Sequence, residues 1–181
     1  MSTIFRTYTG KMVDLANPRV EDVDFTHIRI SLARCARFNG SAATDYNNAK
    51  HSLLAEHCTL DPLIKPYSFV HDFHEAYLGD VLPMTAEACG ATAKLDLLKL
   101  KWDKVIWEAF GLEEPSPYTK RMVNFADRMA FVTEWEHAMG TEKLPGYDDV
   151  EPLSYGEFIR GIHRSFGTVA NQLLPKIPDN S

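Results

Sequence analysis

The feature that most constrains this chain is segment 70–80, which reads VHDFHEAYLGD. It places His71 and Asp72 side by side in an otherwise largely apolar stretch, and Glu75 and Asp80 follow within the same segment. Charged groups next to a buried run are costly for folding unless something compensates the charge. A bound cation would do so, and the segment therefore predicts a metal site.

Two residues elsewhere in the chain are candidates to complete that site. His51 and Asp127 would add a second imidazole and a second carboxylate to His71 and Asp72, and such a mixed ligand set suits Mn, Fe, Co, Ni or Zn better than Ca or Mg. A divalent ion of this kind lowers the pKa of a bound water towards ~7 and polarises a phosphoryl oxygen. Further carboxylates nearby can orient water or manage a proton. The residues thus indicate hydrolysis of phosphate esters.

Less specific interpretations stand beside this one. A His-Asp dipeptide occurs by chance in many proteins, so on spacing alone it is weak evidence. His74 is expected to pack or to form a hydrogen bond rather than to bind metal. Glu134 lies seven residues after Asp127 and shares a helix face with it, which fits either support of the metal ligands or a solvated salt bridge.

Composition and charge limit the class of protein. The 181 residues include 45% hydrophobic and 24% charged residues, which is typical of one globular domain, here taken as 1–181. A net charge of −6 argues against nucleic acid as a partner. Cys35, Cys58 and Cys89 show no metal or disulfide spacing, which favours reduced thiols in the cytoplasm. With no signal peptide and no run of ~20 apolar residues, no membrane association is expected.

The periodicity of apolar residues predicts an all-α fold after a short N-terminal β-hairpin over residues 2–14, with Gly10 at its turn. The helices are expected over 26–37, from 48, over 62–77, from 86 or 92 to 110, over 119–139, and over 154–173. Pro66 lies within the third of these and is expected to delay its start.

Four stretches of the sequence resemble a known family. They are ISLARCARFNG at 30–40, YNNAKHSL at 46–53, VHDFHEAYLGD at 70–80, and Ala126-Asp127. Together they resemble the HD-domain phosphohydrolases, and most of all the small bacterial and phage branch with 5′-deoxynucleotidases and phage dATP triphosphohydrolases. The resemblance covers residues 7–134. It implies an HD-type helical bundle that uses Co, Mn, Zn or Fe, with Mg as an option at a second site.

The resemblance also implies a role for individual residues. His51, His71, Asp72 and Asp127 match the family's metal ligands. Glu75 matches its catalytic glutamate, and Asp80 matches the aspartate that supports this glutamate.

The substrate contacts follow less directly. Arg37 lies near the position of a phosphate-contacting arginine in relatives, and its planar guanidinium suits phosphate. The alternative is a cation at the C-terminal end of a helix, favoured by the helix dipole. Phe38 falls at an aromatic position that touches the nucleoside in relatives.

The sequence departs from the family after Asp80. Many relatives continue with Ile-Pro-x-Pro-Leu-Lys, whereas segment 81–87 reads VLPMTAE, so the phosphate-binding lysine is not at its expected place. Lys94 is the first candidate to replace it, with Lys99 and Lys50 as alternatives. Lys50 itself stands where many relatives have Glu or Gln.

The expected function is therefore metal-dependent hydrolysis of deoxynucleotide 5′-phosphates in the cytoplasm, which is the host cytoplasm if the protein is phage-encoded. The resemblance implies purine deoxynucleotides, and dATP in particular, as the leading substrates, with release of the deoxynucleoside. The alternatives are a 5′-deoxynucleotidase acting on dNMPs and a non-catalytic, nucleotide-binding regulator. Because relatives assemble, a homo-oligomer is also expected.

Overall fold

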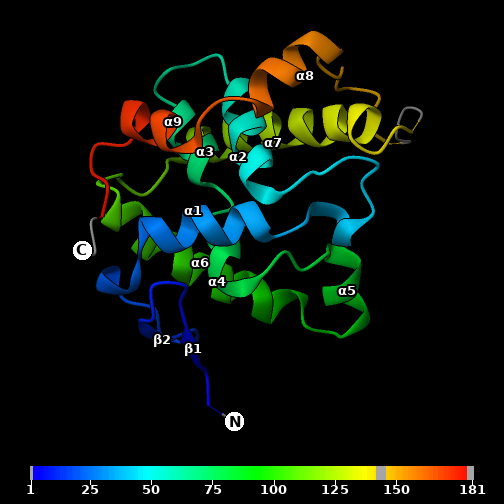
Figure 1. The fold of residues 1–181 in the computed structure, drawn as a ribbon. Coiled ribbons are helices and arrows are strands. Elements are labelled where there is room, and N and C mark those ends of the chain that lie inside the picture. The colour runs from blue at the N-terminus through cyan, green and yellow to red at the C-terminus, as the bar shows by residue number, and fades with distance from the viewer. Residues whose placement is uncertain (1, 142–145, 179–181) are drawn as a thin grey trace.

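The computed structural model describes residues 2–141 and 146–178, and it confirms an all-α fold with a short N-terminal ribbon (Figure 1). In the ribbon, β1 (Ile4–Arg6) pairs antiparallel with β2 (Met12–Asp14). Gly10 adopts a φ of +91° in the connecting turn, a backbone conformation that glycine accommodates without strain. The predicted hairpin is therefore present, with the predicted glycine at its turn.

Helices make up most of the rest of the described chain. They are α1 (Phe25–Arg34), α2 (Asn48–His57), α3 (Lys65–Val70), α4 (Glu75–Leu78), α5 (Pro83–Ala88), α6 (Thr92–Ala109), α7 (Pro117–His137), α8 (Tyr155–Ile162) and α9 (Phe166–Leu173), with the 3-10 turns η1 (Val20–Asp22) and η2 (Arg37–Gly40). Side-chain caps fix several helix starts. The Asp24 side chain accepts a hydrogen bond from the His27 amide at α1, and Asn47 does the same for Lys50 at α2.

The helix expected over 62–77 is two helices. α3 begins at Lys65 with Pro66 in its first turn. The helix thus starts later than residue 62, as predicted from Pro66. A turn over residues 71–74 then separates α3 from α4. His71 and Asp72 therefore lie in a bend between helices and not on one continuous helical face, which frees both side chains to point towards the same neighbour.

Other expected helices are also shorter than the periodicity suggested. Gly90, with a φ of +60°, lies between α5 and α6. Ser165 caps the start of α9 and separates it from α8. The first helix ends at Arg34, so Arg37 lies in the following 3-10 turn. Buried apolar residues recur at helical spacing on both sides of the break between α8 and α9, at Phe158 and Ile162 and then at Phe166 and Val169, so periodicity does not reveal that break.

Two apolar clusters hold the helices together. In the larger one, aromatic rings from several helices meet, with ring centroids 4.7 Å apart for Phe69 and Phe166 and 5.6 Å apart for Phe73 and Phe110. The smaller cluster lies where α2 packs against α7 and α8, and includes Leu54. α2 thus lies between both clusters and is buried along most of its length.

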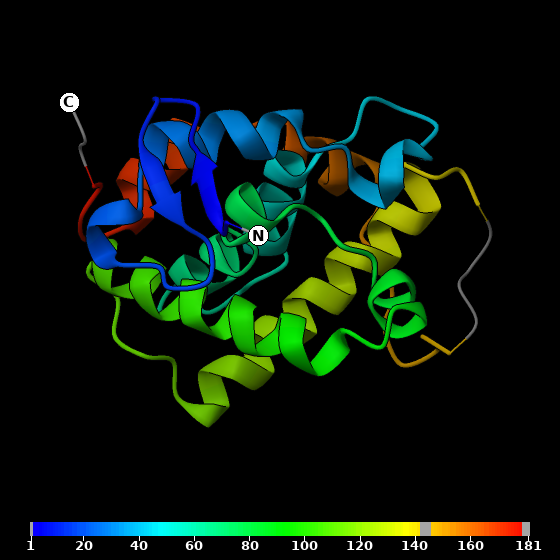
Figure 2. The same cartoon turned by 90° about the horizontal axis from the view of Figure 1, so that it is seen from below.

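The N-terminal ribbon lies against this helical body, on the side of α1 and α6 (Figure 2). The Tyr8 amide donates to Nδ1 of His27 over 3.1 Å, and the Trp102 indole donates to the Leu15 carbonyl over 3.1 Å. These bonds tie the ribbon to α1 and α6. Val13 of the ribbon belongs to the larger apolar cluster and Phe5 packs against it, so the ribbon covers one side of that cluster.

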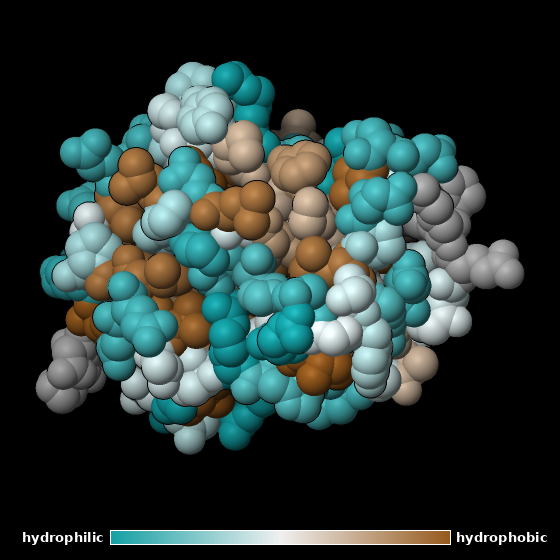
Figure 3. Space-filling view, turned by 90° about the horizontal axis from the view of Figure 1, so that it is seen from above, coloured by the Kyte–Doolittle hydropathy of each residue, from teal (hydrophilic) through white to brown (hydrophobic). Residues whose placement is uncertain are grey.

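The face that carries α8 and α9 shows apolar surface broken into small groups by hydrophilic side chains (Figure 3). Within residues 2–141 and 146–178, no helix combines the length and the apolar character that crossing a membrane requires.

Candidate metal centre and adjoining cavities

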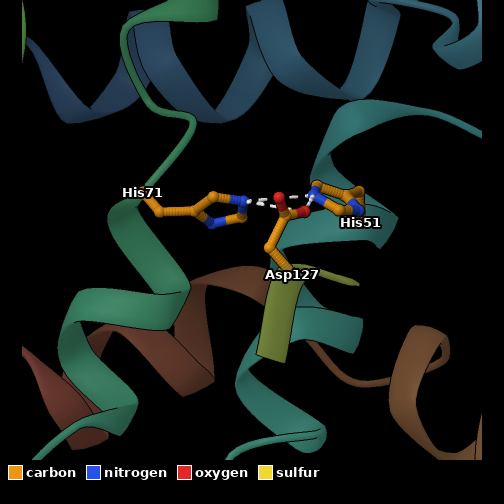
Figure 4. A group of neighbouring side chains, drawn as sticks. All are labelled: His51, His71 and Asp127. Carbon is orange, nitrogen blue, oxygen red and sulfur yellow. Dashed lines mark hydrogen bonds and ion pairs between the residues drawn. The ribbon is translucent and has the colours of Figure 1, made fainter. Parts of the chain in front are cut away.

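Four side chains from three parts of the fold meet at one point. His51 comes from α2, His71 and Asp72 from the bend after α3, and Asp127 from the middle of α7. The Nε2 atoms of His51 and His71 are 3.2 Å apart (Figure 4). Asp127 Oδ1 lies 3.2 Å from Nε2 of His51 and 3.5 Å from Nε2 of His71.

Asp72 approaches the same two imidazoles. Its Oδ2 atom lies 3.3 Å from Nε2 of His51 and 3.2 Å from Nε2 of His71. A cation bound at about 2.1 Å from nitrogen and oxygen ligands would hold neighbouring ligand atoms about 3.0 to 3.4 Å apart. Each carboxylate therefore lies at the spacing of a shared cation from both imidazoles, and the ligand atoms of His51, His71 and Asp127 all lie within 4.8 Å of one another. Mixed N/O ligands of this kind are favoured by transition metals.

Both imidazoles are oriented for metal binding by their other nitrogen. Nδ1 of His51 is 2.5 Å from Oε1 of Glu134, and Nδ1 of His71 is 2.8 Å from the Ser68 carbonyl. Each of these partners is an acceptor, so each Nδ1 carries the proton. The Nε2 atoms then present their lone pairs to the shared point, as metal-binding histidines do.

The electrostatics of the cluster favour positive charge at that point. Burial and the Arg37 guanidinium oppose protonation of His51, but three surrounding carboxylates outweigh both and raise its pKa well above the ordinary value. Burial also opposes protonation of His71, yet Asp72 and Asp127 raise its pKa to about 10. Burial opposes the charge on Asp72, but the two imidazoles hold its pKa well below the usual range. A divalent cation would take the place of these protons.

Glu134 connects this centre to a wider network. It is fully buried on α7, and besides His51 it accepts hydrogen bonds from the Tyr46 hydroxyl at 2.9 Å and from Nε of Arg37 at 3.0 Å. Nη1 of Arg37 lies 3.8 Å from Oδ2 of Asp72. Of the two interpretations of Glu134, the solvated salt bridge is thus wrong. The interpretation of Arg37 as a helix C-terminal cation is also wrong, because the side chain lies beside the metal ligands.

Glu75 lies next to Asp72, and the two carboxylates offer ligand atoms within 4.8 Å of each other. It is buried at the start of α4 and accepts a hydrogen bond from the Asn48 side chain. Burial, together with the charges of Asp72 and Asp80, raises the pKa of Glu75 well above its usual range. Burial likewise raises the pKa of Asp80. The two carboxyl groups therefore hold a proton more readily than exposed carboxyl groups do, which suits a role in proton transfer.

A cavity of about 550 Å³ opens beside the centre. Its charged lining includes Arg37, Glu75, Asp80, Lys99 and Asp127. One part of its wall is aromatic. This aromatic wall is made by Phe38, Phe131, Trp135 and Tyr147, and the centroids of the Phe38 and Phe131 rings are 6.0 Å apart.

Phe38 reaches this wall through an unusual backbone. Phe38 and Asn39 have φ values of +54° and +53°, in the left-handed region that side chains other than glycine rarely adopt. The strained pair reverses the chain within η2, and the Arg37 guanidinium lies 5.6 Å from the centre of the Phe38 ring. Strain of this kind is found at functional sites. Here it brings a charged and an aromatic side chain to one cavity.

Of the three lysines considered for phosphate binding, the first candidate does not lie at the cavity. Lys94 is exposed on α6 and does not line this cavity, whereas Lys99, one of the alternatives, does. Lys50 bonds to the Asp45 carbonyl. His74 is buried, with its Nδ1 2.8 Å from Asp103 Oδ1, which agrees with the hydrogen-bonding role expected for it.

A second group of candidate ligands adjoins the first. Asp72, His74 and Glu75 offer ligand atoms that all lie within 4.8 Å of one another. A second ion is thus compatible with the arrangement. His51, His71 and Asp127 form the other such group among the described residues.

Several site residues had little or no signal in the sequence. Asn48, Phe131 and Trp135 gave none, because their positions depend on how α2 and α7 pack. Glu134 gave a partial signal in its spacing from Asp127, two helical turns away on the same face. Spacing alone did not show that this face is buried against His51.

No family model matches the sequence. An uncharacterized protein of Rhodobacter capsulatus is 31% identical to this chain over 157 residues, which cover 81% of this chain and 75% of that protein. The chain belongs to the family of that protein. The description of this relative assigns no activity, so the function rests on the chemistry of the site.

Proposed function

We propose that this protein is a metal-dependent phosphohydrolase of the HD type that acts on deoxynucleotide 5′-phosphates. One observation supports this most strongly. Two histidines and two aspartates converge with spacings of 3.2 to 3.5 Å beside a buried glutamate and an aromatic cavity. A site for metal storage or structural support would have no need for an unligated carboxyl group of raised pKa facing a cavity.

In this proposal, His51, His71, Asp72 and Asp127 hold the cation. The bound cation would supply Lewis acidity, which favours ionisation of water and neutralises charge on phosphate. Mn, Co, Zn or Fe fits the ligand chemistry.

The chain's own groups supply the rest of the mechanism. Arg37 is held by Glu134 at the edge of the cavity, where its remaining N–H groups can stabilise negative charge on the phosphoryl oxygens. Glu75, positioned by Asn48, accepts the proton of the attacking water. Asp80 supports Glu75 and helps to return a proton to the departing 5′ oxygen. The water oxygen thus bonds to phosphorus while the bond from phosphorus to the 5′ oxygen breaks.

The aromatic wall supports a nucleoside as the other part of the substrate. Bases stack on aromatic rings with about 1–3 kcal/mol per base, largely regardless of sequence. Phe38, Phe131 and Trp135 offer such rings in the same cavity that Glu75 lines. Lys99 adds a cation for further phosphates, which keeps dATP as the leading substrate and dNMPs as the alternative.

A substrate panel tests the proposal. The purified protein is given Mn, Co, Zn or Mg, and then each dNMP, dNTP and rNTP, while release of phosphate and of triphosphate is measured separately. We expect turnover of deoxynucleotides with a transition metal. Triphosphate release from dATP would favour the leading substrate, and phosphate release from dNMPs would favour the alternative.

The panel also separates the proposal from a non-catalytic, nucleotide-binding regulator. Nucleotide binding without turnover under any metal would favour the regulator and contradict the proposal. Asp72→Ala is the matched variant, and undiminished turnover in it would show that the site lies elsewhere. Equal turnover of ribonucleotides would contradict only the preference for the deoxy sugar.

A further inference from the structure

A second cavity of about 350 Å³ adjoins the candidate metal centre. It is lined by His71 and Asp127 on the side of the centre, and the larger cavity shares Asp127 with it. The proposed function uses only the larger cavity. The smaller one therefore lies against two of the candidate ligands and has no assigned occupant.

The order of lining residues along two helices shows how the cavities are arranged. On α7, Lys120, Val123 and Asn124 line the smaller cavity, Asp127 lines both, and Arg128, Phe131 and Trp135 line the larger one. Residues 120 to 135 span about 22 Å at the rise of an α-helix. The two cavities therefore follow one another along α7, with the metal ligand at their junction.

α6 shows the same division. Its residues Leu100, Asp103 and Trp107 line the smaller cavity, and Lys99 lines the larger one. A ligand whose phosphoryl group lay at the centre could thus extend into a cavity on each side.

The lining of the smaller cavity indicates what kind of group it would accept. The rings of Tyr67 and Trp107 and the side chains of Leu100 and Val123 make it largely apolar. Its one lysine, Lys120, is paired with Glu114 at 3.4 Å.

The carboxylates of this cavity exclude one kind of occupant. Asp103 and Asp127 both line it, and its one lysine is paired with Glu114. It therefore offers a chain of phosphates fewer cations than the larger cavity, which Arg37, Lys99 and Arg128 line. An aromatic or nucleoside group fits the chemistry better, because such groups bind in apolar cavities with a few polar contacts.

We propose that the smaller cavity binds the second ester group of a phosphodiester, so that the site hydrolyses phosphodiesters with a nucleoside on one side and an aromatic or nucleoside group on the other. This inference rests on the proposed function, since it uses the same centre. In the reaction, the water oxygen bonds to phosphorus and the bond to the 5′ oxygen breaks with its electron pair. The proton from water passes to that oxygen, which yields a deoxynucleoside and a phosphate monoester of the second group.

The 4-nitrophenyl ester of dAMP is the probe, and dAMP and dATP are the comparison substrates. With the metal that gives the highest turnover in the substrate panel, chromatography measures deoxyadenosine together with 4-nitrophenyl phosphate, the monoester that only cleavage at the 5′ oxygen yields. We expect the diester to be hydrolysed with a kcat/KM at least equal to that of dAMP.

Two variants narrow the smaller cavity from opposite helices. Val123→Phe and Leu100→Phe should each lower kcat/KM for the diester, relative to that for dAMP or dATP, at least tenfold. The ratio of the two substrates is used because a general loss of folded protein leaves it unchanged. Leu97→Phe, on an exposed position of α6 that lines neither cavity, is the matched control and should keep the wild-type ratio.

The outcomes separate the two proposals. Hydrolysis of dAMP or dATP without hydrolysis of the diester would overturn this inference and leave the proposed function intact. A wild-type ratio in both cavity variants would also overturn it. Hydrolysis of no phosphate ester under any metal would overturn the proposed function and this inference with it.

Discussion

Glu134 and His51, 83 residues apart in the chain, are joined by a contact of 2.5 Å between Oε1 and Nδ1 inside the fully buried interface of α2 and α7. The carboxylate sets which imidazole nitrogen carries the proton, and so leaves Nε2 free for a cation. Because the same carboxylate also receives the Arg37 and Tyr46 hydrogen bonds, one side chain positions both a candidate metal ligand and the arginine that we propose binds phosphate.

Replacing this carboxylate should weaken metal binding. Glu134→Gln keeps a hydrogen-bond acceptor but removes the charge that supports His51, and loss of such a partner typically costs about 10-fold to 100-fold in metal affinity. Competition with a chromogenic chelator for Co or Zn measures the change. Glu136→Gln, an exposed position on the same helix, is the control and should bind metal as the wild type does. Unchanged affinity in Glu134→Gln would show that the imidazole is oriented by other contacts.

Metal should stabilise the folded protein through the four ligands. A ligand that binds only the native state stabilises it by about 2.7 kcal/mol when its concentration is 100 times the Kd. We therefore expect added Co or Zn to raise Tm in a thermal unfolding experiment, and excess chelator to reverse the increase. Asp127→Asn should lose most of the increase, because it removes one anionic ligand. An equal increase in this variant would contradict the assignment of Asp127.

Glu75 should matter for turnover and little for metal binding. Glu75→Gln retains the shape and the hydrogen bond to Asn48 but cannot take up a proton, so kcat should fall about 10²-fold to 10⁴-fold. The affinity for Co, measured by the same chelator competition, should stay within a few-fold of wild type. A parallel loss of metal affinity and turnover would instead identify Glu75 as a ligand of the second group of candidate ligands.

The aromatic wall should act on the base. Trp135→Leu removes a ring from the larger cavity, and loss of about 1–3 kcal/mol of stacking would raise KM for dAMP about 5-fold to 150-fold. The matched substrate is 2-deoxyribose 5-phosphate, which lacks the base and should show an unchanged KM. Equal effects on both substrates would mean that the base binds elsewhere.

Stability should depend on pH through His27, far from the metal ligands in sequence. Burial lowers the pKa of His27, whose Nδ1 accepts a hydrogen bond from the Tyr8 amide. The unfolded chain then binds more protons than the native state below pH 6.5, so this contribution to stability is present above that pH and is lost as the pH falls. The free energy of unfolding, measured by denaturant at pH 5 to 8, should fall less steeply towards low pH in His27→Gln than in wild type. His163→Gln, at an exposed position, should keep the wild-type slope.

The sequence predicts the candidate metal ligands more completely than the residues that hold those ligands in place. The contiguous motif at 70–80 identifies His71, Asp72 and Glu75, since their chemistry is local and their spacing is recognisable. Glu134 and Asn48 act through the packing of helices that are distant in the chain. Their roles follow from burial, which spacing does not reveal.

The helix boundaries show a similar limit. Apolar periodicity predicted one helix over 62–77, because the residues on both sides of the bend face the same core. The bend itself depends on the tertiary contacts of His71 and Asp72. Likewise, residue type does not reveal the left-handed backbone at Phe38, since among residues other than glycine it is mainly Asn, as at position 39, that favours this conformation.

The position of Asp127 at the middle of an unbroken helix has a consequence for reading relatives. Residues three and four before it face one cavity, and residues four and eight after it face the other. The position of a residue along α7, counted from Asp127, therefore indicates which cavity its side chain faces. In a relative, larger side chains on one side of the position of Asp127 would narrow one cavity and so exclude one half of the substrate. A single stretch of sequence would show this.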